Sequence, residues 1–174
     1  TYPPAPGSWQ VLYYDGDSAD LQRRLVPSDE SLIYPACAIT FSSRQTLPPL
    51  ESLYLERVGL SYDAYYSDAL SEKKKEFDAY IKITEHLEEI YGKNTSYHQI
   101  LGYPYQIQGD LLLECQQGTQ YQGDPTDWQL LLQIDSDKNA HMMWGDVGAL
   151  YFYISQQALL ERDFSQVHLL MQCS

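Results

Sequence analysis

The sequence predicts an α+β fold with a largely antiparallel sheet. Apolar segments of strand composition are grouped along the chain with helices inserted, an order typical of this class. One long segment has helical periodicity instead. The chain has 174 residues and is 44% hydrophobic, which is enough for one globular core. We therefore expect a single domain over residues 1–174, with the Pro-rich "TYPPAPG" of residues 1–7 as an extended lead-in.

The clearest helix lies within residues 67–93, "SDALSEKKKEFDAYIKITEHLEEIYGK". One face of this helix is apolar and the other carries Glu and Lys, so we expect the apolar face to cover a sheet. Gly92 can end the helix. A short helix is predicted in "SQQALLERDF", residues 155–164, with Ser155 as its N-cap. The apolar face of the long helix consists of Phe77, Tyr80, Ile81, Thr84, Leu87 and Tyr91.

Strands are predicted where apolar and β-branched residues run together between turn residues. Pro35 places the start of the second such run at a sheet edge or bulge. The segment "GDLLLECQQG", residues 109–118, fits either a short helix or a strand. The predicted strands lie in residues 8–17, 32–43, 98–108, 128–135, 148–154 and 165–173.

The formal net charge is −13, from 24 acidic and 11 basic residues. Such a surface repels phosphate backbones and anionic lipid, which argues against nucleic acid and membranes as partners. The basic run Lys73 to Lys75 lies in an acidic helix and is interpreted as a solvated face. We expect the partner to be another protein or a second copy of the chain.

Three cysteines, Cys37, Cys115 and Cys173, lack the spacing of a disulfide framework or a zinc site. They are expected to act as small buried hydrophobic residues in a reducing compartment. The sequence has no apolar run of membrane-span length and no signal-peptide pattern, so a cytoplasmic location is expected. The chain begins with Thr1 rather than Met, so whether a segment precedes it in the native protein is an open question.

An acidic cluster lies between two apolar runs. Asp135, Asp137, Asn139 and Asp146 occupy positions 1, 3, 5 and 12 of a calcium-type loop. Ala140 stands where an EF-hand needs Gly, and the flanking runs are strands rather than helices. The favoured interpretation is therefore a turn capped by Asp and Asn side chains, with no cofactor. The alternative is a calcium or magnesium site.

Catalytic motifs are weak. A hydrolase would use Asp135 or Asp146 as general base with His141 assisting, but their spacing does not fix a geometry. No GxSxG or Gly-rich phosphate loop occurs, and no catalytic residue is predicted. Trp144 with Gly145, and Tyr103 with Tyr105, are the candidate binding residues, since aromatic rings can contact a ligand or partner. Core packing is the simpler interpretation of Trp144.

Four ordered motifs resemble a known family, the YwqG-like family, a bacterial domain of unknown function. They are "LGYPYQIQGD", "WQLLLQIDSD", "MMWGDVGALYFYI" and "LLERDFSQVHLLMQC", and the resemblance covers about residues 97–173. It implies an internally duplicated fold whose second copy is present here, marked by Gly102 to Pro104, Gln133-Ile134 and Gly148 to Tyr153. The first copy is not recognised, which implies a shortened member or a trimmed longer protein.

The resemblance brings no activity. A fold lacking one half would expose the surface that the other half covers, inviting self-association or a partner. Some relatives are associated with toxin–immunity neighbourhoods. One form of a binding function is therefore an acidic immunity-type protein that masks a basic partner. The first hypothesis is therefore a non-enzymatic binding protein. The alternative is a metal-dependent binding module or hydrolase centred on the Asp135–Asp146 loop.

Overall fold

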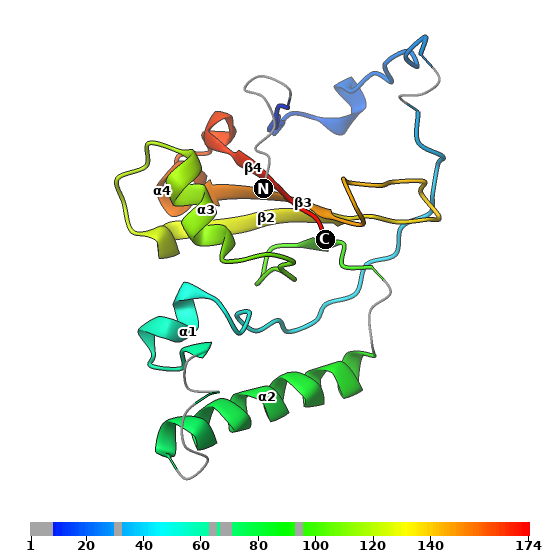
Figure 1. Ribbon diagram of the computed structural model, residues 1–174. Helices are drawn as coiled ribbons and strands as arrows, with labels where there is room; N and C mark the ends of the chain where they lie inside the picture. Colours follow the sequence, from blue (N-terminus) through cyan, green and yellow to red (C-terminus); the bar gives the residue numbers. More distant parts are fainter. Residues whose placement is uncertain (1–8, 30–32, 63–65, 67–70, 93–95) are drawn as a thin grey trace.

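The computed structural model describes residues 9–29, 33–62, 66, 71–92 and 96–174. It confirms the α+β class: a four-stranded antiparallel sheet accompanies a long helix and a short C-terminal helix (Figure 1). In order, the main elements are α1 Leu53–Arg57, α2 Glu72–Tyr91, β1 Gln99–Ile100, α3 Leu111–Gly118, β2 Trp128–Asp135, β3 Ala149–Ser155, α4 Gln156–Leu160 and β4 His168–Gln172.

The strands follow one another across the sheet in sequence order, β1-β2-β3-β4, and every neighbouring pair is antiparallel. Tyr151 pairs with Gln133 on one side and with Leu170 on the other. Since paired residues point to the same face, this register gathers their side chains on one side of the sheet. A shift in register between Leu130 and Leu132 marks a bulge in β2.

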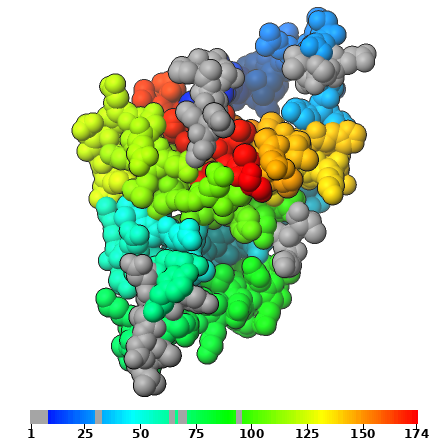
Figure 2. Space-filling model, viewed as in Figure 1, coloured from blue at the N-terminus to red at the C-terminus, as the bar shows by residue number. Residues whose placement is uncertain are grey.

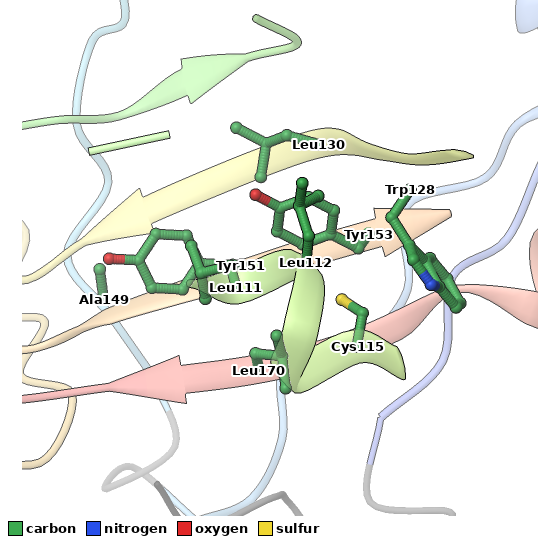
Figure 3. Close-up of a cluster of buried hydrophobic side chains, with 9 residues drawn as sticks. All are labelled: Leu111, Leu112, Cys115, Trp128, Leu130, Ala149, Tyr151, Tyr153 and Leu170. Atoms are coloured by element: carbon green, nitrogen blue, oxygen red, sulfur yellow. The ribbon is translucent and has the colours of Figure 1, made fainter. Parts of the chain in front are cut away.

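The core lies between α3 and that face. Leu111 and Cys115 of α3 are 1% and 0% exposed and meet Tyr151 and Tyr153 of β3 (Figure 3). Figure 3 shows the side chains of β2, β3 and β4 directed toward α3. The segment 109–118 is therefore a helix, because its apolar spacing of three and four residues puts Leu111, Leu112 and Cys115 on one face.

Two buried glutamines hold residues 105–108 over the same face. Gln133 accepts a hydrogen bond from the backbone N–H of Tyr105 at 3.0 Å. Gln172 accepts from the N–H groups of Ile107 and Gln108, each at 2.9 Å. Both glutamine residues are 0% exposed. This segment was expected to be a strand, but only Gln99–Ile100 joins the sheet, because glutamine side chains take the place of a backbone ladder.

The two predicted N-terminal strands are wrong within the described residues. Residues 9–17 and 33–43 form neither helix nor strand ladder there. Strand composition favours an extended backbone, whereas a strand also needs a neighbouring edge with which to pair. Within the described residues, neither edge strand of the sheet, β1 nor β4, pairs with this part of the chain.

The long helix α2 does not act as the cover of the sheet. It packs on the chain before α1, where the Tyr80 hydroxyl donates to the carbonyl of Pro48 at 2.6 Å. The Tyr91 hydroxyl accepts from the N–H of Gln45 at 3.2 Å. In Figure 1, α2 and α1 lie below the sheet while α3 lies across it. Phe77 is the one buried residue of α2, and the other residues of the predicted apolar face are half-buried or exposed.

The cysteines are all free, as expected from their spacing, but their burial differs. Cys115 is buried in the core, and burial raises the pKa of its thiol well above the usual value. Cys37 is exposed, contrary to expectation, because the segment that carries it lies on the surface. Among the described residues, no helix has the length and apolar character to cross a membrane.

Candidate functional site

The loop that joins β2 to β3 holds its two leading aspartates through backbone hydrogen bonds. Asp135 accepts from the N–H groups of Tyr97 and Ser136, both at 2.9 Å. Asp137 Oδ1 accepts from the N–H of Asn139 at 2.7 Å and from that of Ala140 at 3.4 Å. The hydrogen bond from Asn139 is the main reason why the pKa of Asp137 lies below its usual value. This is the geometry of a capped turn.

His98 connects this loop to the chain before β1. Its Nδ1 accepts from the N–H of Asp135 at 3.1 Å, so the ring proton sits on Nε2. Nε2 in turn donates to Asp137 Oδ2 at 3.2 Å. No sequence pattern indicates this role, since His98 lies 37 residues before Asp135 and only the pairing of β1 with β2 brings them together.

The remaining two predicted metal ligands face outward. Asn139 and Asp146 are exposed, and the backbone carbonyl of Asp146 accepts from the N–H of Ser174 at 3.0 Å. Within the described residues, no three His, Cys, Asp or Glu side chains gather as a group that could hold a metal ion. His141, the assisting base of the hydrolase alternative, is exposed with a φ of +52°. The metal hypothesis stays a prediction.

Trp144 and Gly145 belong to the same loop. The Trp144 indole donates to the carbonyl of Asp135 at 3.2 Å, and its backbone N–H donates to Ser136 Oγ at 3.0 Å. Its ring lies 6.1 Å from that of Tyr34. Gly145 is exposed, with a φ of +59° that favours glycine. Trp144 therefore fastens the loop and contacts the N-terminal part of the chain.

Tyr103 and Tyr105 lie elsewhere, beside β1 and α1. The exposed Tyr105 ring stacks on Tyr97 with 3.8 Å between centroids. The half-buried Tyr103 meets the ring of Tyr54 edge-on at 5.3 Å. The four predicted binding residues thus form two pairs in separate places rather than one site.

Two hollows adjoin Tyr103. The first has a cavity volume of about 320 Å³ and lies between α1, α3 and β2. The second, of about 490 Å³, is a more open groove between residues 44–51, α2 and residues 97–109. The sequence offered no signal for the first hollow, because its walls come from four separate stretches of the chain.

A third feature is the N-terminal segment, which we define as residues 9–29 and 33–41. Trp9 and Val11 pack against a second core cluster that contains Ile154 and Val167. Tyr13 stacks on Phe164 with ring centroids 5.0 Å apart. Beyond these anchors the segment lies on the surface, and the space-filling view shows it standing out at the top of the molecule (Figure 2).

These features define an acidic α+β domain in which one helix covers an antiparallel sheet and an extended segment runs along its outside. The chain belongs to the family described as Domain of unknown function (DUF1963), whose family model matches residues 2–173. The match extends well beyond residues 97–173, where the motifs alone placed it, and takes in the N-terminal half. No curated protein matches the chain.

Proposed function

We propose that this chain is a YwqG-like bacterial protein that binds another protein through the N-terminal segment and does not catalyse a reaction. One observation carries the proposal. Apart from the short 3-10 helix Ser18–Asp20, the segment forms neither helix nor strand ladder within the described residues, and it exposes a succession of large apolar side chains. Single exposed apolar residues are ordinary on protein surfaces, but a long series of them marks an interaction site.

Beyond Trp9 and Val11, the exposure is large along the segment. Leu12 is 78% exposed, Leu25 92%, Ile39 75% and Phe41 81%. Burying such side chains removes apolar area from water, at about 25 cal/mol per Å². An extended backbone can also add to the edge of a partner's sheet, which gives affinity through main-chain hydrogen bonds. The segment offers both contributions to a partner.

The charge favours a basic partner over a second copy. Four aspartates, Asp15, Asp17, Asp20 and Asp29, accompany Arg23 and Arg24 in the segment, and the whole chain carries −13. Bringing two such copies together opposes like charges, whereas a basic partner is attracted. The immunity-type role, in which an acidic protein masks a basic one, is consistent with this charge. We therefore propose a partner with an apolar contact surface and a basic rim.

Site-specific photo-crosslinking in the native cell tests the proposal. A photoreactive residue at Leu25 or Phe41 is expected to capture one protein, and the same residue at the exposed Glu85 of α2 serves as control. With the purified partner, Phe41→Asp should weaken binding by about tenfold or more, as expected for a buried anchor. Binding should also weaken as salt is raised.

Three results would count against this function. Equal capture from residues 25, 41 and 85 would show that the segment has no special role. An affinity that does not change with ionic strength would contradict the proposed basic rim on the partner. Crosslinks that map to the chain itself, together with a dimeric mass in light scattering, would show that the segment binds a second copy of this chain instead of another protein.

The alternative function is a divalent-cation site at the Asp135–Asp146 loop. In its favour, the Asp135 and Asp137 carboxylates belong to the same turn, so oxygen donors are near one another. Calorimetric titration of calcium, magnesium, manganese and zinc into metal-stripped protein tests it, with Asp137→Ala as control. Binding heat that the substitution abolishes would establish the site, whereas absence of heat in both proteins would leave the loop a turn.

A further inference from the structure

We propose that the cavity between α1, α3 and β2 binds a small protonated amine. We call it the interhelix cavity. Its lining residues are Pro49, Ser52, Tyr54, residues 101–104, Gln106, residues 110–112, residues 128–130 and Tyr153. The proposal rests on this cavity alone and does not depend on the N-terminal segment.

The cavity has the size and walls of a small-molecule site. Its volume of about 320 Å³ is at the lower end of the range for ligand pockets. Leu112, Leu130 and Tyr153 form part of the core side of the cavity, and Figure 3 shows them between α3 and the sheet. Tyr54 and Tyr103 line it from α1 and from the chain after β1, with their rings edge-on at 5.3 Å. Aromatic and aliphatic side chains thus form much of the walls.

Ser52 supplies a buried polar group without a partner. It is 3% exposed, and its hydroxyl has no hydrogen bond among the described residues. A serine at this position, immediately before α1, would ordinarily cap the helix, but its side chain makes no capping bond. The carboxylate of Asp110 instead accepts from the N–H of Leu53. A buried hydroxyl left unpaired is unfavourable, so a ligand group that bonds to it would stabilise the protein.

The charge of the lining selects the class of ligand. Asp110 is the one acidic residue among the lining residues, and none of them is Lys, Arg or His. The Asp110 carboxylate accepts from Leu112 and Leu53, which leaves acceptor capacity on both oxygens. Burial raises the pKa of Tyr54 to about 12, so its ring stays neutral. A carboxylate beside neutral aromatic rings attracts a cation and repels an anion.

An ammonium group meets each of these conditions. Its positive charge is attracted to Asp110 and to the faces of the tyrosine rings. Its N–H groups can donate to the Ser52 hydroxyl, which lacks a partner. The apolar remainder of such a molecule would lie against Leu112 and Leu130. A primary amine on a short aromatic or aliphatic chain is therefore the class that the cavity fits.

Three probes of similar shape test the proposal on the full chain: 2-phenylethylamine, 2-phenylethanol and 3-phenylpropionate. Calorimetry at neutral pH should rank the amine first and the propionate last, with about tenfold between amine and alcohol, as for a charge-assisted interaction. Asp110→Asn removes the charge and keeps one oxygen that can still cap α3, although its amide nitrogen cannot accept from the N–H of Leu53. It should lower the affinity for the amine by about tenfold and leave that for the alcohol within about twofold.

Asp163→Asn is the matched control. Asp163 also caps a helical turn, Phe164–Gln166, and the substitution changes the net charge by the same amount away from the cavity. It should leave all three affinities unchanged. Ser52→Ala should weaken the amine and the alcohol alike, by about fivefold, because both lose a hydrogen bond. Circular dichroism confirms that each variant is folded.

Several results would overturn the proposal. Binding of the propionate as tight as that of the amine would refute the proposal, because it would show that the Asp110 carboxylate does not govern selection. Equal effects of Asp110→Asn and Asp163→Asn would show a general charge effect. No binding of any probe at about 10 mM would show that the cavity takes no such ligand. None of these outcomes affects the crosslinking test of the N-terminal segment.

Discussion

At the scale of single residues, Gln133 and Gln172 are fully buried, and they replace backbone pairing with side-chain hydrogen bonds. Gln133 bonds to both the N–H and the carbonyl of Tyr105, at 3.0 and 3.2 Å. Gln172 accepts from Ile107 and Gln108 and also donates to Glu114 Oε1 at 2.7 Å. Each amide therefore satisfies groups that would otherwise be buried without partners. The "QI" at the end of β2 thus has a structural role.

Adding a single methyl group at Gly148 should strongly destabilise the fold. A Cβ there would lie 2.2 Å from the carbonyl oxygen of Gln172 and 2.5 Å from that of Trp144, both backbone atoms. Gly148→Ala is expected to lower the free energy of unfolding by about 2–4 kcal/mol, because backbone must move. Urea unfolding measures this.

Gly59→Ala is a suitable control for Gly148→Ala. Gly59 has a φ of +81° but nothing within 4 Å of the added Cβ, so only backbone strain of about 1 kcal/mol is expected. Equal losses from the two substitutions would contradict the close approach at Gly148.

His168 should make stability depend on pH. Its ring lies near Trp9 and Trp128, with centroids 6.5 and 6.4 Å away, and its Nε2 is buried without a partner among the described residues. Burial lowers the pKa of His168 below its usual value. The unfolded chain then binds a proton more readily than the folded chain, so the free energy of unfolding should fall as pH drops below about 6.5.

Urea unfolding between about pH 7.5 and pH 5.5 checks this dependence. His168→Phe should flatten the decline, since it removes the titrating group while keeping a ring. His86→Gln, on the exposed side of α2, should leave the decline as it is. A decline that persists unchanged in His168→Phe would assign it to other groups.

At the scale of secondary-structure elements, Asp110 joins the beginnings of two helices. It is the N-cap of α3, where Oδ1 accepts from the N–H of Leu112 at 2.7 Å. Its Oδ2 accepts from the N–H of Leu53, the first residue of α1. Two helices that are far apart in the sequence therefore begin at one carboxylate, and this junction closes one side of the interhelix cavity.

Asp110→Ala should consequently cost more than the loss of an ordinary cap. One N-cap contributes about 1 kcal/mol, so the loss of both bonds should lower the free energy of unfolding by about 2 kcal/mol or more. Asp163→Ala removes one cap of a short turn and should cost about half as much. Chemical unfolding compares them, and a cost for Asp110→Ala no greater than that for Asp163→Ala would contradict the double role.

Helix boundaries followed from local chemistry. Ser155 caps α4 as predicted, accepting from the N–H of Ala158 at 3.2 Å. Gly92, with a φ of +77°, follows the last residue of α2. Such features depend on residues within one or two turns, so the sequence shows them directly. The partners of α2, in contrast, are set by contacts with residues 44–48, which the helical pattern cannot reveal.

At the scale of the whole molecule, the charge should oppose folding. A net charge of −13 on a chain of 174 residues produces self-repulsion in the compact state. We expect the midpoint of urea unfolding to rise as sodium chloride is increased from about 10 mM to 300 mM, because the ions screen that repulsion. A midpoint that falls with added salt would mean that attractive ion pairs outweigh the repulsion.

The sequence by itself determined the α+β class, strands β2, β3 and β4, the long helix, the capped turn after β2 and the acidic character. Each depends on periodicity, composition or neighbouring residues. The tertiary structure alone decided that His98 meets Asp137, that Ser52 and Asp110 share one cavity, and that the described part of the N-terminal segment joins no strand of the sheet. These arrangements depend on contacts between distant parts of the chain, and local patterns carry no information about which distant residues meet.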